Sequence, residues 1–227
     1  MLIIIPAYNE EQNVGRVVSQ CLTWGRVLVI DDGSTDRTAQ VAALAGADVM
    51  VHNRNRGYCA SLQDGYYHAL AKGEAMLVQL DADGQHDPAF IPQVSMPVLN
   101  NSADIVIGSR FLMGYYRVEF PKALGMLFFR HLVRRFTGSP ITDTTSGFQC
   151  LSREAIKFFL KEIFPIDYPD ANVIIKCVRA GLRVQEVPVV MCPNPQGRSM
   201  HRGAIKIARY MGSVMGDIFK EVGNGEV

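Results

Sequence analysis

The sequence lacks the features that mark disordered, fibrous and membrane-spanning proteins. Its 227 residues are 48% apolar and 20% charged, which is typical of a folded globular domain. The formal net charge is only +1, so no bulk basic charge favours binding to nucleic acid. No segment approaches the roughly 20 uninterrupted apolar residues that a membrane-spanning helix needs. We therefore expect one main α/β domain that does not bind nucleic acid and does not cross a membrane by itself.

Cysteine is scarce and follows no metal-binding or disulfide pattern. The five cysteines form an odd set without a CxxC, which predicts buried thiols in a reducing compartment. At the N-terminus the apolar run ends at Pro6 and acidic residues follow, so it is too short for the core of a signal peptide. These two features predict a cytoplasmic protein.

Four common catalytic signatures are also missing. The sequence contains no GxxxxGK[ST], no GxGxxG after a predicted strand, no HExxH and no GxSxG. Their absence argues against a P-loop nucleotidase, a dinucleotide-binding oxidoreductase, a zinc protease of that type and an α/β-hydrolase. The chemistry has to be sought in other motifs.

The first half of the chain alternates between predicted strands and predicted helices. Short apolar runs of strand length occur at residues 2–5, 27–30, 48–51, 76–80 and 104–107. Segments with helical spacing separate them, at residues 10–23, 36–45, 58–71 and 88–99. This alternation predicts a mostly parallel sheet flanked by helices, in which ligands bind beyond the carboxyl ends of the strands.

After residue 110 the alternation becomes less regular. We expect helices at residues 120–136 and 171–180, and strands at residues 148–151 and 182–190. A final amphipathic helix is expected at about residues 203–222. We therefore divide the chain into a catalytic domain, residues 1–202, and a C-terminal amphipathic helix, residues 203–227, packed on it or on a membrane surface.

Polar residues follow the first four predicted strands at what should be one edge of the sheet. Asp32 can accept hydrogen bonds from a nucleobase or ribose, Tyr8 can stack on a base, and Gly57 allows close backbone approach. The alternative is that these loops only supply turn and helix-cap chemistry, as we expect for Asp36. Four such loops in succession favour a nucleotide-binding site.

Asp81 and Asp83 follow the fourth predicted strand. Two carboxylates at this spacing, with Gln85 as a neutral oxygen ligand, suit Mg²⁺ or Mn²⁺ bound together with a diphosphate. The start of the next helix, with Asp87 as N-cap and Pro88 in the first turn, strengthens this interpretation. His86 is expected to be either part of this site or a surface loop residue.

Seven segments together resemble a known family over nearly the whole chain. They are IPAYNEEQNV (5–14), VIDDGSTDRT (29–38), NRG (55–57), LDADGQHDP (80–88), IGSRF (107–111), DTTSGFQC (143–150) and GRSMHRG (197–203). The sequence resembles the inverting family 2 glycosyltransferases of the GT-A, Rossmann-like fold. Within them it is similar to the branch of dolichyl-phosphate mannose synthase and bacterial polyprenyl-phosphate glycosyltransferases.

The resemblance implies transfer of a sugar from a UDP- or GDP-sugar to a polyprenyl phosphate. It implies nucleotide contacts from Pro6, Tyr8, Glu10, Asp32, Asn55, Gly57, Asp81 and His201. Mg²⁺ or Mn²⁺ would be held by Asp81, Asp83 and Gln85. The implied catalytic residues are Asp83, the phosphate-binding cations Arg110, Lys122 and Arg198, and Asp170 on the acceptor side. An ionised acceptor phosphate would need no general base.

Two departures from the branch leave alternatives open. Tyr58 and Met200 stand where the branch often has lysine, and His201 is either a substitute diphosphate ligand or a loop residue. A hydroxyl acceptor in polysaccharide or glycan synthesis would need a base, for which Asp170 is the better candidate than Asp143. Both acids are otherwise explained as a helix cap and a turn residue. A third possibility is a scaffold that binds nucleotide-sugar without turnover.

The predicted helix at residues 120–136 combines apolar side chains with several basic ones. Such a helix suits an anionic membrane surface or a polyprenyl phosphate, and equally an ordinary core-facing helix with a solvated basic side. Together with the resemblance, it predicts a protein at the cytoplasmic face of the membrane. The contact would be peripheral or made through a partner membrane protein.

Overall fold

The computed structural model describes residues 1–113, 120–164, 171–192 and 216. Seven strands form one sheet: β1 (Leu2–Ala7), β2 (Arg26–Asp31), β3 (Asp48–Val51), β4 (Met76–Gln79), β5 (Ile105–Ser109), β6 (Gln149–Ser152) and β7 (Val184–Pro188). The helices are α1 (Val14–Cys21), α2 (Thr38–Leu44), α3 (Tyr58–Ala71), α4 (Ile91–Leu99), α5 (Phe120–Thr137), α6 (Arg153–Phe158) and α7 (Ala171–Arg179). A 3-10 turn, η1 (Pro88–Phe90), precedes α4, and a π-helical turn, η2 (Phe159–Ile163), follows α6.

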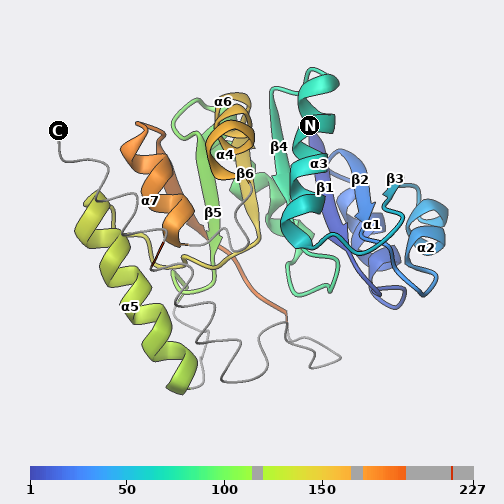
Figure 1. The fold of residues 1–227 in the computed structure, drawn as a ribbon, viewed down its shortest axis with the longest axis horizontal. Coiled ribbons are helices and arrows are strands. Elements are labelled where there is room, and N and C mark those ends of the chain that lie inside the picture. The colour runs from blue at the N-terminus through green and yellow to red at the C-terminus, as the bar shows by residue number, and fades with distance from the viewer. Residues whose placement is uncertain (114–119, 165–170, 193–215, 217–227) are drawn as a thin grey trace.

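The strand order is β3-β2-β1-β4-β6-β5-β7. All neighbouring pairs are parallel except those of β6, which runs antiparallel to both β4 and β5. The predicted mostly parallel sheet is therefore confirmed. The reversal of β6 was not predicted. It brings the start of β6 to the same edge of the sheet as the carboxyl ends of its neighbours (Figure 1).

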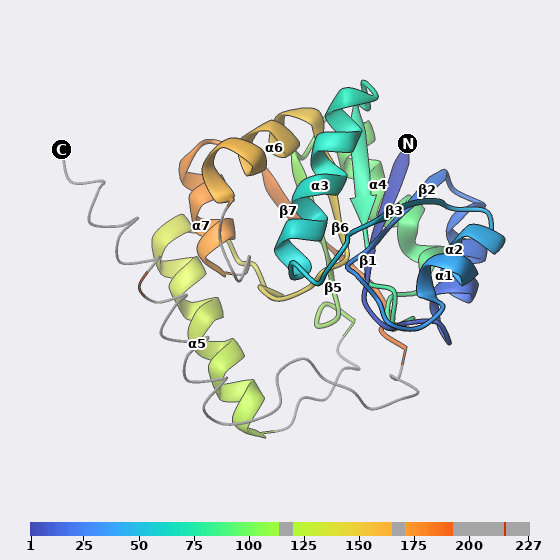
Figure 2. The ribbon, with the colours of Figure 1, turned by 45° about the vertical axis from the view of Figure 1, so that its right-hand side comes forward.

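The sheet has a hydrophobic core on each face. In β1, Leu2 and Ile4 belong to one core, and Ile3 and Ile5 to the other, because successive side chains of a strand point to opposite faces. Helices α3, α5, α6 and α7 cover the first face, and α1, α2 and α4 cover the second (Figures 1 and 2). Burial on both faces explains why these strands are nearly continuous apolar runs.

The helix starts follow local capping chemistry. Asp87 accepts a hydrogen bond from the Ala89 N–H at 2.9 Å, which confirms its predicted capping role, although the first turn is 3-10. Asp36 accepts one from the Thr38 N–H at 2.9 Å, so α2 begins two residues later than predicted. Helix α6, capped by Ser152, was missed because its six residues are too short for a periodic signal.

Other expectations fall partly or wholly outside the described residues. The predicted helix at residues 203–222 and the domain boundary at residue 202 lie outside the described residues, apart from residue 216.

The five free thiols differ in burial. Cys21, Cys150 and Cys177 are buried as predicted, whereas Cys59 and Cys192 are half-buried. Burial raises the pKa of Cys21 and of Cys150 to about 12, which makes these thiols unreactive at neutral pH. None of the described helices has the length and apolar character needed to cross a membrane.

Tyr66 offers a test of the core beneath α3. Its buried hydroxyl donates a hydrogen bond to Oε1 of buried Gln79, and its ring meets Phe159 edge-on at 5.7 Å between centroids. Tyr66→Phe should lower the free energy of unfolding by about 1–3 kcal/mol, because it leaves the Gln79 amide oxygen buried without its donor. Urea unfolding with a common m-value would measure this loss.

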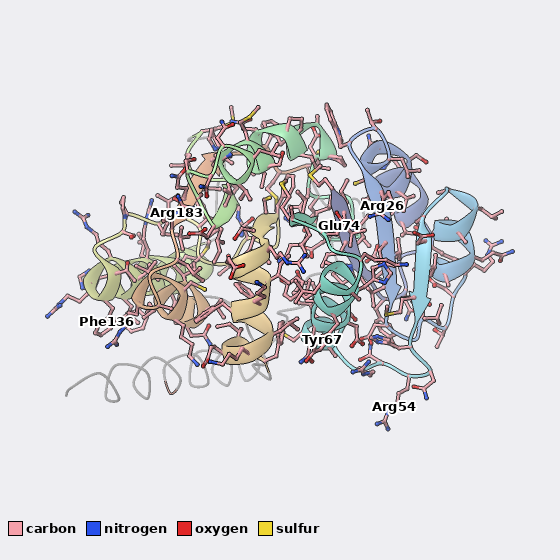
Figure 3. All side chains as sticks on the ribbon, turned by 90° about the horizontal axis from the view of Figure 1, so that it is seen from above. Arg26, Arg54, Tyr67, Glu74, Phe136 and Arg183 are labelled. Atoms are coloured by element: carbon pink, nitrogen blue, oxygen red, sulfur yellow. The ribbon has the colours of Figure 1, made fainter. Side chains whose placement is uncertain are left out.

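The neighbouring Tyr67 provides the matched control. Its side chain is 54% exposed and lies at the surface of α3 (Figure 3). Tyr67→Phe removes the same hydroxyl and should change the free energy of unfolding by no more than about 0.5 kcal/mol. Equal effects of the two substitutions would contradict the assigned role of the Tyr66–Gln79 hydrogen bond.

Candidate active site

The loops that follow β1 and β2 are joined by side chain to backbone hydrogen bonds. Asn9 has a left-handed backbone, with φ of 56°, and its Oδ1 accepts a hydrogen bond from the Thr35 N–H at 2.9 Å. The Asn9 N–H donates to Ser34 Oγ at 2.9 Å, and the Glu10 N–H donates to Thr38 Oγ1 at 2.8 Å. These contacts make the two loops one wall of the site.

Three predicted nucleotide-binding residues lie on or near this wall. Strand β1 continues to Ala7, further than predicted, so Pro6 is buried inside the strand. Tyr8 is the first exposed residue after the strand, and its side chain is 47% exposed. The half-buried Glu10 accepts a hydrogen bond from Asn13 Nδ2 at 2.8 Å. Tyr8 is therefore the residue of the three with the most surface for a ligand.

Asp32 is buried and holds the loop that follows β3. Its Oδ1 accepts the Arg56 N–H and its Oδ2 accepts the Gly57 N–H, both at 2.8 Å. His52 Nδ1 lies 2.7 Å from the same Oδ1. The sequence predicts that Asp32 binds the nucleoside, and in this structure both of its oxygens bond to the protein. Asn55 is exposed on the same loop.

Gly57 occupies a backbone position that glycine favours. Its φ is +94°, and a Cβ built on it would meet nothing within 4 Å. The space beside this backbone is therefore open, as the predicted close approach of a ligand requires.

Asp81 and Asp83 lie beyond the end of β4. Asp81 Oδ1 accepts a hydrogen bond from Tyr58 Oη at 3.1 Å, and a Cβ on Gly147 would lie 3.0 Å from Asp81 Oδ2. Asp83 Oδ1 accepts the Gln85 N–H at 2.9 Å. Burial raises the pKa of the Asp83 carboxyl and the nearby Asp81 charge adds to the rise, so a bound cation would favour ionised Asp83.

This donor set fits a hard divalent cation. Two carboxylates and the Gln85 amide are oxygen ligands of the kind that Mg²⁺ and Mn²⁺ take. Within the described part of the chain, no group of three or more His, Cys, Asp or Glu residues is placed to hold a metal ion. Three oxygen ligands would fill only part of the octahedral shell of Mg²⁺, so coordination positions would remain for water or a diphosphate.

The structure corrects the expectation that His86 could be a surface loop residue. His86 is buried, its Nδ1 accepts the Asp81 N–H at 3.2 Å, and its ring lies 5.4 Å from that of Phe148. An isolated bridge joins His86 to Met191, and the Cys192 N–H donates to the Gln85 carbonyl at 2.8 Å. The loop at residues 81–86 is thus attached to the chain that follows β7.

Arg110 and Asp143 form a buried ion pair at the end of β5. Arg110 Nε lies 2.7 Å from Asp143 Oδ2, and Arg110 Nη2 lies 2.9 Å from Oδ1. Glu186 on β7 accepts the N–H groups of Thr142 and Asp143, at 2.7 and 2.6 Å. Asp143 is fully buried, so its geometry matches the turn residue among our alternatives and not an acceptor base.

The remaining predicted site residues fall outside what the structure describes. Asp170, Arg198 and His201 lie in segments that it does not describe. Lys122 lies in the first turn of α5, and its side chain is likewise outside the described atoms. The roles of these four residues stay predictions.

Sequence reasoning missed several residues that shape the site. His52 directly follows β3, so the rule about carboxyl ends of strands could have found it. Asp64 and Glu186 carry no such local signal, because each meets its partner through the fold. Gly147 lies in the segment DTTSGFQC, but its closeness to Asp81 and Tyr58 does not follow from that motif. Only their spatial arrangement identifies them.

Comparison with known proteins agrees with this geometry. The sequence profile described as glycosyl transferase family 2 matches residues 2–160. The chain belongs to glycosyl transferase family 2. It is thus a glycosyltransferase by family, and the strands and loops that carry Asp32, Asp81 and Asp83 lie inside the matched segment.

Two relatives of this family member cover most of its length. A polyprenol monophosphomannose synthase of Mycolicibacterium smegmatis is 32% identical over 89% of this chain and 81% of its own. An undecaprenyl-phosphate mannosyltransferase of Micrococcus luteus is 31% identical over 90% of this chain and 88% of its own.

A solved structure of similar fold confirms the GT-A architecture. It is the glucosyl-3-phosphoglycerate synthase of Mycobacterium tuberculosis in complex with Mn²⁺ and UDP-glucose. It matches with a TM-score of 0.74 and 20% sequence identity, over 98% of this chain and 78% of that one. At this identity the likeness concerns the fold alone.

The ion pair of Arg110 with Asp143 predicts a large effect on stability. Asp143→Ala should lower the free energy of unfolding by about 3–5 kcal/mol, because it leaves a largely buried guanidinium without its carboxylate. Glu154→Gln is the control, since the Glu154–Lys157 pair is solvent-exposed and should contribute less than about 1 kcal/mol. Denaturant unfolding would compare them, and a small loss for Asp143→Ala would argue against the pair as a structural lock.

Proposed function

We propose that this protein transfers a sugar from a nucleotide-sugar donor to a polyprenyl phosphate, with inversion at the anomeric carbon, in a metal-dependent reaction. The observation that carries the proposal is the pair of relatives at 31–32% identity that are named for transfer to polyprenyl phosphates and cover about nine tenths of the chain. The two carboxylates beyond β4 and the polar loops beyond β1 to β3 supply a matching site.

The proposed donor lies across the carboxyl edge of the sheet. Its nucleoside meets exposed Tyr8 and the open backbone at Gly57, while Asp32 keeps the loop that carries Gly57 in place. The diphosphate then lies toward Asp81 and Asp83, which follow the adjacent strand β4. We leave the base, UDP or GDP, and the sugar open.

Asp81, Asp83 and Gln85 are the residues that would hold Mg²⁺ or Mn²⁺. When bound, the divalent ion supplies Lewis-acid stabilisation of the charge that develops on the departing nucleoside diphosphate. Tyr58 holds Asp81 by its hydroxyl hydrogen bond, and the lack of a side chain at Gly147 leaves room for both. These contacts keep the first carboxylate fixed before any ligand arrives.

The proposed reaction is a displacement at the anomeric carbon. An ionised oxygen of the acceptor phosphate forms the new bond to the anomeric carbon. The bond from this carbon to the nucleoside diphosphate breaks, and the nucleoside diphosphate leaves with the electron pair. A phosphate monoester is already anionic at neutral pH, so no proton has to be removed during attack. The task of the protein is then to hold two anionic substrates in line, which is a matter of positioning and of cationic side chains.

The proposed cations are Arg110, Lys122 and Arg198. Arg110 directly follows β5, and its pairing with Asp143 fixes the guanidinium. Asp170 has no necessary role with a phosphate acceptor. It becomes the proposed base only if the acceptor is a hydroxyl group.

An activity assay with a matched pair of variants tests this proposal. With Mn²⁺, the protein should transfer labelled sugar from a UDP- or GDP-sugar to polyprenyl phosphate. Asp83→Asn should lower kcat/KM by about 100-fold or more, because it removes a charge that holds the ion against the developing negative charge. Extraction of labelled lipid into organic solvent measures the product.

Asp87→Asn is the control in the same loop. Asn caps a helix start about as well as Asp, so this variant loses one negative charge and keeps the Ala89 hydrogen bond. It should retain activity within about threefold of the wild type, since surface changes of this kind have small effects. Transfer only to saccharide hydroxyls, or nucleotide binding without any turnover, would overturn the proposed acceptor.

We further propose that α5 attaches the protein to the cytoplasmic face of a membrane, directly or beside a partner membrane protein. Leu127 and Phe128 are exposed on it, at 56% and 40%. The helix contains Arg130, Arg134 and Arg135 and no acidic residue. It packs on α7 and extends beyond the carboxyl edge of the sheet in both views (Figures 1 and 2). Exposed apolar and basic side chains suit an anionic lipid surface.

Charge reversal tests the contribution of α5. The double variant Arg134→Glu, Arg135→Glu should weaken binding to vesicles that contain anionic phospholipid by about tenfold or more. The variant Lys157→Glu, Lys161→Glu makes the same change of charge at exposed positions on α6 and η2 and should bind nearly as the wild type does. Co-sedimentation measures both, and equal losses would indicate a general charge effect in place of a surface on α5.

A further inference from the structure

His52 lies between two carboxylates at the nucleotide end of the site. It follows β3, its side chain is buried, and its N–H continues the sheet by donating to the Asp31 carbonyl at 2.9 Å. Nδ1 lies 2.7 Å from Asp32 Oδ1, and Nε2 lies 2.9 Å from Asp64 Oδ2. The ring therefore connects the end of β2 to helix α3.

Both ring nitrogens face an acceptor, so the ring has little freedom to turn. A carboxylate only accepts hydrogen bonds, so the proton of this contact is on Nδ1, and it joins the Arg56 and Gly57 N–H groups as a donor to Asp32. On the other side, Arg56 pairs with Asp64 Oδ2 and its Nη1 lies 3.4 Å from His52 Nε2. The charged groups around the ring are thus Asp32, Asp64 and Arg56.

Asp32 transmits the position of this ring to the loop that follows β3. One oxygen accepts both His52 Nδ1–H and the Arg56 N–H, and the other accepts the Gly57 N–H. Rotation of the carboxylate would break all three contacts together. Arg54, on the same loop, extends away from the body of the protein and takes no part in the arrangement (Figure 3).

We propose that His52, supported by Asp64, is a positioning residue that sets the affinity for the donor nucleotide through Asp32 and without touching the nucleotide. This inference depends on the proposed function, since it requires a nucleotide beside Gly57. According to this inference, the His52 side chain, which lies behind the loop that follows β3, partly determines how tightly the donor nucleotide binds. The atom responsible is Nδ1, which donates its hydrogen bond to Asp32.

Two substitutions of His52 separate its two ring nitrogens. An Asn amide nitrogen falls near the place of Nδ1, whereas a Gln amide nitrogen falls near that of Nε2. His52→Gln should weaken binding of UDP or GDP, measured by calorimetry with MnCl₂, by about tenfold, because Asp32 loses its side-chain donor. His52→Asn should bind within about threefold of the wild type, and both variants should keep kcat at saturating donor.

Further variants and outcomes keep the inference falsifiable. The Asp64 side chain is 23% exposed, so the protein should tolerate a substitution there better than at buried His52. Asp64→Asn should weaken nucleotide binding about threefold. His68→Asn and His68→Gln, on the same helix, should leave it unchanged. If the two His52 variants bound the nucleotide equally well, or if His52→Gln bound it as tightly as the wild type does, the inference would be overturned. The proposed function would then remain intact. A wild-type protein that binds neither nucleotide would instead refute the proposed function itself and the inference with it.

Discussion

The parallel hydrogen-bond ladder of β1, β2, β3 and β4 is the constraint on which the site depends. Parallel pairing brings the carboxyl ends of these strands to one edge, and it leaves the backbone groups of the following loops without sheet partners. Side chains of the loops fill that need: Asn9 bonds the neighbouring loop, and Asp32 bonds the Arg56 and Gly57 N–H groups. Residues that suit a ligand are thus also residues that the fold requires.

Most of the fold could be predicted because its information is local. Strands buried on both faces are nearly continuous apolar runs, and most of the helices show their spacing in the sequence. The direction of β6 could not be predicted, since a run of four residues has the same composition in either orientation. Helix α6 was missed for a related reason, because its buried face is completed only by η2.

The candidate site was predictable to the extent that it follows the ends of strands. That rule found Asp32, Asp81 and Asp83, and the structure places all three at the expected edge. It could not find the partners of these residues. Arg110 and Asp143 are 33 positions apart, and Asp143 and Glu186 are 43 apart, so no periodicity links them. For Asp32, the partners show that both oxygens of a residue chosen for contact with a ligand already bond to the protein.

The hydrogen bonds between the loop at residues 81–86 and the chain that follows β7 have a thermodynamic consequence. Cys192 and Met191 bond to the backbone of Gln85 and His86, so the chain leaving β7 and the loop that carries Asp83 share one set of hydrogen bonds. Coupling of this kind is reciprocal. A ligand that orders one of the two segments reduces the conformational entropy that is lost when the other segment becomes ordered. A ligand that orders the loop carrying Asp83 therefore lowers the entropy cost of ordering Met191 and Cys192, and the reverse holds equally.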